Sequence, residues 1–458
     1  MKPVTTLLLA VFLLPCYAPV FAQSASTGNQ SISYFTNVRL ITGDGNSVEN
    51  GVLAIRDDVI LDAVPAIELD IPAGSIVHDL TGKTIMPALV NTHAHLGWEA
   101  YGSWGSQHFT EANLTDHLYR HAYYGVGTII STGSDKEDVA RRVKLEQLRG
   151  NVGGARYQLS PGMGSPGGGP NPRFTDDPDY WGIRPISNRE EAIRTVRELA
   201  GAGYGIAKIW VDARDERRGA QVKLAPEIYR AVLETAQDND MRIIAHATTL
   251  ADHKSLVRYG NRRFIHMPYD VEVDQEYLDL AREHNVFIVP TLGMITKREP
   301  YYLPAFEDPF FYDQVTDSVL ESLRAGYEPP PTTRSAAAEA RSKMLADNLL
   351  KLKDHIILGT DAGAVGDFFG FADHVELALF VRMGMTPAEA IVAATSRSAK
   401  AFGLNNVGLL QAGKSADFII LDENPLTDIN NTRQISDVYL RGQRVDREGL
   451  RAGWTEEK

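Results

Sequence analysis

The feature that most constrains the fold is a regular alternation of short apolar segments with amphipathic stretches, which runs through most of the chain. Eight apolar segments are predicted to be strands, and helical patterns fill most of the gaps between them. Strands that alternate with helices favour a parallel sheet, and eight such units favour a closed (β/α)8 barrel of the α/β class. The predicted strands are residues 89–92, 128–131, 157–160, 206–211, 243–247, 264–266, 287–291 and 356–360.

Short β-rich segments flank this region on both sides. They lie at 34–41, 52–55, 60–64 and 76–80 before it, and at 418–421, 438–440 and 443–445 after it. Turn residues separate them, as is typical of antiparallel strands. We expect residues 23–86 and 404–458 to pair as one small β-sandwich domain, with residues 87–403 forming the barrel.

The first 22 residues have the pattern of a secretory signal peptide. Lys2 supplies a positive charge, residues 5–14 are apolar, and small residues precede a cleavage point after Ala22. This pattern predicts an exported protein, periplasmic or secreted. The apolar run is too short to cross a bilayer, and no other membrane span is expected. Cys16 is the only cysteine, so the mature chain would contain no thiol.

Composition narrows the class of partner. The 458-residue chain carries a formal net charge of −13, and 43% of its residues are hydrophobic. An acidic protein lacks the cationic surface that phosphate binding requires, which argues against nucleic acid. A small-molecule substrate is the expected partner, and assembly into a homo-oligomer is left open.

Polar residues of metal-binding type follow several of the predicted strands. His93 and His95 are two residues apart on one strand, so both side chains point to the same face. Alone, this pair is a weak signal. His246, His266 and Asp361 end three further apolar strands, and such ends meet at one face of a barrel. Imidazoles and a carboxylate are ligands that zinc-type ions prefer.

Lys208 lies inside the apolar segment 206–211, where a buried ammonium would be costly. One interpretation is that it reaches the rim or pairs with an acid such as Asp212. The other is that it reacts with CO2 to form a carbamate, an anion able to bridge two metal ions. Burial would lower the lysine pKa and supply the neutral amine that this reaction needs.

Two long connections are predicted on the same face. Residues 160–185 are rich in glycine and proline, and residues 295–335 contain six aromatic residues between Tyr301 and Tyr312. Aromatic residues there would suit the wall of a substrate pocket. His108 and His253 are also expected near this face, as candidate substrate contacts.

Several segments together resemble the amidohydrolase superfamily, in particular secreted members similar to imidazolonepropionase and Xaa-Pro dipeptidase. The segments are IMPALVNTHAHL, GYGIAKIWV, AHATT, FIHMP, GTDAG, GMTPAEAIVAATSRSAKAFGL and VGLLQAGKSADFIILDENPL. They cover nearly all of the mature chain and occur in the family's order. Some such relatives split the amide of ochratoxin-like N-acyl amino acids.

The resemblance implies a site with two divalent metal ions, with zinc expected. His93, His95 and Asp361 would hold one ion, and His246 and His266 the other. Carboxylated Lys208 and a hydroxide would bridge the two. Imidazolonepropionase itself uses one metal without a bridging lysine, so Lys208 disfavours that activity. Relatives often carry a histidine in the glycine-rich loop. Here the loop reads SPGGGPNPRF and contains no histidine.

The resemblance further implies hydrolysis of the amide bond of dipeptides or N-acyl amino acids by the bridging hydroxide. Asp361 would take a proton from the hydroxide and pass it to the leaving amine. Arg173, Arg214 and Tyr269 are candidate partners of the substrate carboxylate. A lactone, cyclic-amide or organophosphate hydrolase with the same metals is the alternative. A non-catalytic binding protein is less favoured, because all six ligand positions are intact.

Overall fold

The computed structural model describes residues 32–101, 103–166, 169, 183–213, 222–297, 299, 302–330, 334–363 and 367–456. The predicted signal peptide with Cys16 lies outside these ranges, as do Arg173 and Arg214. In the described part of the chain, no helix is both long and apolar enough to cross a membrane.

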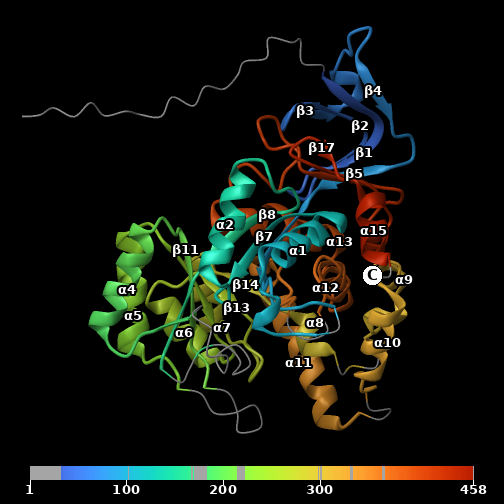
Figure 1. The fold of residues 1–458 in the computed structure, drawn as a ribbon. Helices are drawn as coiled ribbons and strands as arrows, with labels where there is room; N and C mark the ends of the chain where they lie inside the picture. The colour runs from blue at the N-terminus through green and yellow to red at the C-terminus, as the bar shows by residue number, and fades with distance from the viewer. Residues whose placement is uncertain are drawn as a thin grey trace, which may run out of the picture.

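One part of the fold is an eight-stranded sheet built from both ends of the chain, at the top of Figure 1. Its order is β17-β16-β15-β5-β1-β2-β3, and β4 pairs with β1. The predicted association of the two chain ends is therefore observed. The strands are β1 (Ser33–Ile41), β2 (Ser47–Arg56), β3 (Val59–Pro65), β4 (Ile76–Asp79), β5 (Thr84–Pro87), β15 (Phe418–Leu421), β16 (Ile435–Leu440) and β17 (Gln443–Arg444).

These strands form one continuous hydrogen-bonded sheet, which both ends of the chain supply as predicted for the small β-domain. The reason is that β1 shares one edge between two partners: its first half pairs with β4 and its second half with β5. Register shifts near Val38 bend the strand between the two. Antiparallel pairing of β5 with β15 then joins the N-terminal strands to the C-terminal ones. Stacked Phe418 and Tyr439, 4.8 Å apart, are part of its core.

The second part is the parallel barrel, in which seven of the predicted strands form ladders. The ladders run β6-β7-β8 and β9-β11-β12-β13-β14, and β8 and β9 follow each other directly in the chain. The eighth predicted strand is an extended segment that closes the ring through single bridges, Ile288 with Ile356 and Ala94 with Ala362. The strands are β6 (Leu89–Ala94), β7 (Val126–Thr132), β8 (Arg156–Ser160), β9 (Gly162–Gly164), β10 (Ile183–Pro185), β11 (Ile206–Trp210), β12 (Arg242–His246), β13 (Arg263–Ile265) and β14 (Phe287–Val289).

Helices cover the outside of this barrel (Figure 1). Many begin at a residue whose side chain accepts a backbone N–H, such as Asn188 before α4 and Asp274 before α7, and this fixes their first turns. They are α1 (Glu111–Tyr123), α2 (Glu137–Leu148), α4 (Arg189–Gly201), α5 (Pro226–Asp238), α6 (Leu250–Arg258), α7 (Gln275–Glu283), α8 (Leu292–Thr296), α9 (Pro309–Tyr312), α10 (Asp317–Ala325), α11 (Ala336–Leu352), α12 (Phe371–Arg382), α13 (Pro387–Val392), α14 (Ser398–Phe402) and α15 (Arg447–Thr455).

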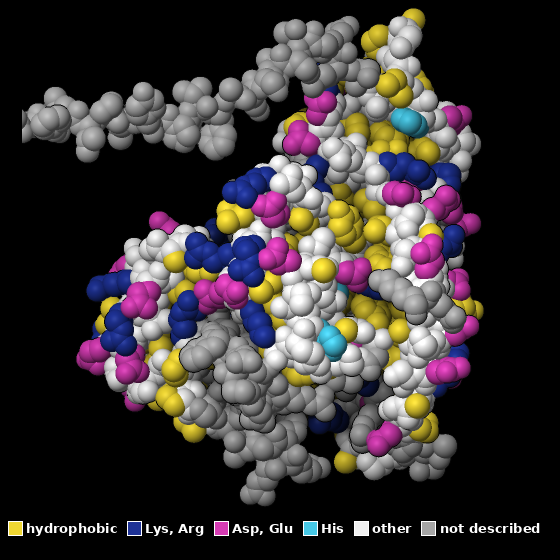
Figure 2. Space-filling model, viewed as in Figure 1, with side chains coloured by type: hydrophobic (Ala, Val, Ile, Leu, Met, Phe, Trp, Pro, Cys, Tyr) yellow, Lys and Arg dark blue, Asp and Glu magenta, His cyan; other side chains and the backbone are white. Residues whose placement is uncertain are grey.

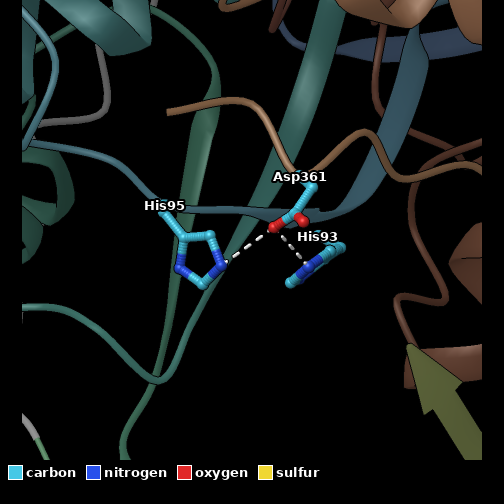
Figure 3. Close-up of side chains that lie close together, drawn as sticks. All are labelled: His93, His95 and Asp361. Atoms are coloured by element: carbon cyan, nitrogen blue, oxygen red, sulfur yellow. Dashed lines mark ion pairs between the residues drawn. The ribbon is translucent and has the colours of Figure 1, made fainter. Parts of the chain in front are cut away.

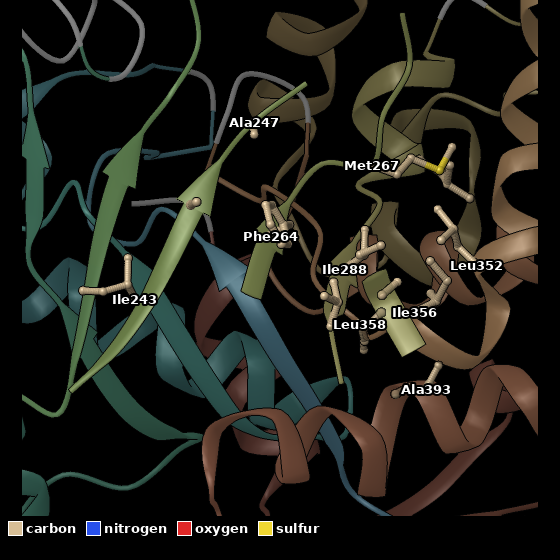
Figure 4. Close-up of a cluster of buried hydrophobic side chains, with 14 of the residues drawn as sticks. Ile243, Ala247, Phe264, Met267, Ile288, Leu352, Ile356, Leu358 and Ala393 are labelled. Carbon is tan, nitrogen blue, oxygen red and sulfur yellow. The ribbon is translucent and has the colours of Figure 1, made fainter. Parts of the chain in front are cut away.

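The barrel core lies between the strands and these helices. Ile243, Phe264 and Ile288 come from the consecutive strands β12, β13 and β14, and Leu352 ends α11 (Figure 4). Each of the four is at most 4% exposed. Close packing of this kind fixes the strand positions, and with them the side chains at the strand ends. On the surface, Figure 2 shows acidic and basic side chains interspersed.

The aromatic segment, described here over residues 302–330, was predicted to line a substrate pocket, but its aromatic side chains mostly pack inside the protein. It forms α9, α10 and a short 3-10 turn, and its phenylalanines face the protein interior. Phe311 is 1% exposed and lies 4.3 Å from the ring of Phe368. Phe306 is also buried, whereas Tyr312 is exposed. The apolar side chains pack this segment against the barrel. Tyr301 lies outside the described residues.

Candidate metal centre

Three of the predicted ligands meet at the end of β6. Asp361 Oδ1 lies 2.9 Å from His93 Nε2 and 3.0 Å from His95 Nε2 (Figure 3). One ligand atom from each residue falls within 4.8 Å of the others, and all three side chains are buried. Asp361 adopts a left-handed backbone conformation, with φ of 63°, and this strained geometry turns its carboxylate toward the histidines.

A second pair of histidines lies beside this group. The rings of His246 and His266 are 4.5 Å apart at 81°, and the His266 ring is 6.3 Å from the ring of His93. His246 ends β12, and His266 follows β13, so the two come from neighbouring strands. The structure thus brings the four histidines and Asp361 together at one end of the barrel.

The electrostatics of the cluster favour neutral rings at His93 and His266 and an ionised carboxylate at Asp361. Burial, reinforced by the Lys208 charge, lowers the pKa of His93 to about 3. Burial and the neighbouring His246 hold the pKa of His266 well below its ordinary value. Burial alone would raise the pKa of Asp361, but His93 and His95 keep it well below the usual range. These are the protonation states in which such groups bind a cation.

Lys208 occupies the middle of β11 and is 1% exposed. Burial lowers its pKa to about 7, and the Asp361 charge only partly opposes this. In the described part of the chain Lys208 has no ion pair, and its Nζ lies 5.4 Å from the ring of Trp210. The charge of Lys208 acts on His93 and His266, and the charge of Asp361 acts on Lys208, so this buried amine lies beside the cluster.

Two glycines make room for Lys208 and Trp210. A Cβ atom on Gly133 would lie 2.4 Å from the Trp210 ring and 2.9 Å from Lys208 Cγ. Gly133 also has a φ of +82°, which favours glycine. A Cβ on Gly162 would lie 2.8 Å from the same tryptophan ring. Gly133 after β7 therefore makes room for both side chains, and Gly162 at the start of β9 makes room for Trp210.

Four further side chains hold the histidines in place, and no sequence motif marks them as functional. His93 Nδ1 contacts Thr132 Oγ1, and His95 Nδ1 lies 2.7 Å from Ser134 Oγ. His266 Nδ1 lies 2.6 Å from Thr291 Oγ1, and His246 Nε2 lies 3.1 Å from Asp212 Oδ2. Partners of this kind fix the ring orientation and tautomer of a metal ligand.

The only sequence feature that could have pointed to these four residues is their position at the ends of strands. Thr132 is the last residue of β7, and Ser134, Asp212 and Thr291 each lie two residues beyond a strand. Hydroxyl and carboxylate residues are common at strand ends, so residue type alone could not single them out. Asp212 was considered as a partner of Lys208, whereas the structure places it against His246.

The predicted substrate contacts fall into different environments. His253 is fully buried and stacks on Phe264 at 4.3 Å. Its Nδ1 lies 2.7 Å from the Tyr277 hydroxyl and its Nε2 donates to Ala247 O at 3.0 Å, so both nitrogens have partners within the protein. This geometry gives His253 a packing role and does not support a substrate contact.

His108 and Tyr269 remain candidates by position. His108 is half-buried in the connection after β6, where its Nε2 lies 2.8 Å from Ser103 Oγ. The Tyr269 ring is 6.5 Å from the ring of His266, and its backbone N–H donates to Thr248 O at 3.1 Å. Tyr269 therefore lies directly beside the cluster.

The donor set fits a divalent metal ion. Neutral imidazole nitrogens and a carboxylate are zinc-type ligands, and three of them already converge within bonding range of a common centre. Residues contributed by different strands of a barrel, all at one end, are the usual construction of a catalytic site on this fold.

Comparison with known proteins supports the same assignment. The model of the Amidohydrolase family matches residues 84–445. Ochratoxinase of Aspergillus niger is 27% identical over 442 residues, which cover 88% of this chain and 84% of the relative. Imidazolonepropionase of Deinococcus deserti is 37% identical over 415 residues, covering 87% and 92%. A solved Xaa-Pro dipeptidase with bound methionine has a TM-score of 0.71 at 21% identity, covering 90% and 99%. With the family's model matched from the end of the N-terminal sheet to the C-terminal strands, the chain belongs to the amidohydrolase family and is a hydrolase.

Proposed function

We propose that this hydrolase cleaves the amide bond of dipeptides or N-acyl amino acids that carry a free carboxylate. The observation that carries the proposal is Lys208, a buried amine without an ion pair in the described part of the chain, beside a histidine–aspartate cluster. The four histidines, Asp361 and a modified Lys208 would together hold two divalent ions, with zinc expected.

The modification we propose is a carbamate. The neutral amine of Lys208 attacks CO2, a bond forms between Nζ and carbon, and one proton is released. The product is an anion with two oxygens, which offsets the charge of two cations where an ammonium would repel them. A pKa lowered to about 7 leaves a large neutral fraction of the amine at neutral pH.

The residues of the cluster then have separate tasks. Ions held by the four histidines, Asp361 and modified Lys208 would acidify a water molecule and polarise the scissile carbonyl. Asp361, which its neighbours keep ionised, accepts the proton of the attacking water and passes it to the nitrogen of the leaving amine. Thr132, Ser134, Thr291 and Asp212 keep the imidazole rings oriented during this exchange.

The names of the relatives support this substrate class. One similar structure is called a Xaa-Pro dipeptidase, and one similar sequence is called an ochratoxinase. A lactone, cyclic-amide or organophosphate hydrolase with the same ligands is the alternative. Parallel assays on amide and lactone substrates separate the two.

The structure offers a cation for the substrate carboxylate. Arg341, exposed on α11, places its guanidinium 5.5 Å from the ring of Tyr269, which lies beside His266. Within the residues described, Arg341 has no ion pair, whereas Lys343 on the same helix pairs with Asp347. Arg341 and Tyr269 together could hold a carboxylate near the metal ligands, in addition to the predicted Arg173 and Arg214.

The test combines metal analysis with a matched substrate pair. Purified protein is analysed for metal and then assayed with N-acyl amino acids and dipeptides, each with a free or an amidated C-terminus. We expect the free acids to be preferred, and Arg341→Gln to raise their KM about tenfold or more. Lys343→Gln is the control and should leave KM unchanged. Equal turnover of free and amidated substrates would refute the carboxylate requirement.

We further propose that the protein is exported and cleaved after Ala22. Sequencing the N-terminus of the protein recovered from the periplasm or the medium tests this, and a mature chain that begins at Met1 in the cytoplasm would contradict it. The state of assembly is measured in the same preparation by light scattering.

A further inference from the structure

Thr291 has an unusual backbone conformation for its residue type. Its φ is 51° and its ψ is 50°, the left-handed region, although threonine is β-branched. L-residues other than glycine, asparagine and aspartate seldom adopt this region, and a β-branched residue is a clear outlier. Thr291 is fully buried between β14 and α8. Strain of this kind persists where the surrounding contacts enforce it.

The hydroxyl of Thr291 determines the tautomer of His266. Thr291 Oγ1 donates to the carbonyl oxygen of Pro290 at 2.7 Å, an atom that can only accept. The hydroxyl has one proton, and when Pro290 O takes it, the Thr291 oxygen is left to accept from His266 Nδ1, 2.6 Å away. Nδ1 of His266 therefore carries the ring proton, and the lone pair is on Nε2. That is the form in which His266 can bind a metal ion through Nε2.

A second residue, Glu376 on α12, holds the turn that contains Thr291. Glu376 Oε1 accepts the backbone N–H of Leu292 at 2.7 Å, and Oε2 accepts that of Gly293 at 2.8 Å. These are the two peptide groups that follow Thr291 directly. Glu376 is 1% exposed, so its carboxylate is buried to make these bonds. No step of the proposed hydrolysis uses it.

We propose that Glu376 and Thr291 are positioning residues for the metal centre. Glu376 fixes the two peptide groups after Thr291 and thereby holds Thr291 in its strained conformation. Thr291 in turn aims its hydroxyl at His266 and keeps the lone pair of that imidazole on Nε2. The inference rests on the proposed role of His266 as a metal ligand, but its test measures metal affinity and does not need a substrate.

The first experiment compares Thr291→Val with Thr291→Ser. Valine keeps the shape and removes the hydroxyl, whereas serine keeps the hydroxyl. Metal-free protein is titrated with Zn²⁺ in competition with a chromophoric chelator, and the affinity is determined for each equivalent of Zn²⁺ that binds. We expect the valine variant to bind about 10- to 100-fold more weakly and the serine variant to stay within about threefold of the wild type. The Co²⁺ absorption spectrum should change in the valine variant only.

A second pair of variants separates positioning from simple stabilisation. Thr291→Gly relieves the left-handed strain, so the Tm of the metal-free protein should stay equal or rise by about 1–3 °C, while Zn²⁺ affinity falls. Glu376→Gln removes one of the two acceptors and should weaken Zn²⁺ binding about tenfold. Glu389→Gln is the matched control, because Glu389 Oε2 accepts the backbone N–H of Thr386 at 2.8 Å to cap α13, on a helix that contributes no ligand.

The outcomes discriminate clearly. Wild-type Zn²⁺ affinity in Thr291→Val, or equal affinities in Glu376→Gln and Glu389→Gln, would overturn the proposal. If Thr291→Val does not fold, the glycine and serine variants decide together. Affinity lost in Thr291→Gly and kept in Thr291→Ser supports a role of the hydroxyl, and affinity kept in Thr291→Gly or lost in Thr291→Ser overturns it. Failure of every amide substrate would count against the proposed function and leave these measurements valid.

Discussion

Asp361 and His93 are joined twice. Their side chains meet at 2.9 Å, and the backbone N–H of Asp361 donates to the carbonyl oxygen of His93 at 3.1 Å. The two contacts connect β6 to the segment that closes the barrel, so the carboxylate and the imidazole move as a unit. A ligand pair that is fixed in this way is preorganised for a metal ion.

Removing the charge of Asp361 should therefore remove metal and activity together. Asp361→Asn keeps the side-chain shape, but a neutral amide is a weaker ligand and cannot transfer the proton. We expect hydrolysis to fall about 10²- to 10⁴-fold and metal content, measured by mass spectrometry, to drop. In the wild type, chelation should abolish activity and added Zn²⁺ should restore it. Full activity of a verified metal-free sample would contradict this.

Lys208→Ala should lower the metal content without unfolding the barrel. The buried amine has no ion pair in the described part of the chain, so its removal breaks no salt bridge, but it removes the proposed anionic ligand. We expect nearly complete loss of turnover. Propionate at high concentration should enter the vacated space and restore part of the activity, and propionamide should not. Normal metal content and turnover in the variant would reduce Lys208 to a structural residue.

Gly133→Ala should disturb the site through crowding. The added methyl group would lie 2.4 Å from the Trp210 ring, at a φ of +82°. We expect a loss of about 2–3 kcal/mol in the free energy of unfolding and reduced metal binding, because Lys208 is displaced with Trp210. Gly203→Ala, also at positive φ but with open space around it, measures the conformational cost alone. Equal effects of the two substitutions would exclude crowding as the cause.

Asp373 should make stability depend on pH. It is fully buried on α12, and burial raises its pKa from the ordinary 3.8 to about 8. The folded protein thus retains a proton that the unfolded chain releases, and stability falls as the pH rises from about 4 to about 8. The contribution is on the order of a few kcal/mol. Asp373→Asn should flatten this slope.

Calorimetry at several pH values checks that expectation. Glu376, whose pKa burial also raises to about 8, leaves a residual slope of the same sign in the variant. The difference between wild type and Asp373→Asn is therefore the quantity to compare. An identical pH dependence of Tm in both proteins would show that Asp373 does not titrate in this range.

The grouping of the four histidines with Asp361 could be predicted from the sequence because position and residue type agree at each strand end. His246 and His266 follow apolar segments that can only be buried strands, and the parallel arrangement brings such ends together. Lys208 was identifiable because a charge inside an apolar segment is costly. The residues that orient the imidazoles were not predictable, since Thr291 gains its role from a backbone conformation that no sequence pattern announces.

Other parts of the fold depend on contacts between distant residues. The strand β9, Gly162–Gly164, has no apolar pattern and exists because its backbone pairs with β11. The buried face of the aromatic segment is decided by Phe368 and Phe371, which lie some sixty residues later in the chain. The sequence shows Phe306 and Phe311 in one aromatic-rich segment, but it does not indicate whether their side chains face a substrate or the protein interior.

The sheet that joins the chain ends also sets an order of assembly. β5 lies between β1 and β15, and the contact of Lys83 with Asp422 spans 339 positions of sequence. A chain synthesised from its N-terminus must keep the edge of β5, with Ile85 and Met86, unpaired until the last strands have been made. The barrel can close before the sheet is complete. We therefore expect the slow step of folding to be the final pairing of β5 with β15, which come from opposite ends of the chain. Truncation of the last strands would leave the edge of β5 open to pairing with other chains. The expected result is aggregation, and not a shift of the active-site residues.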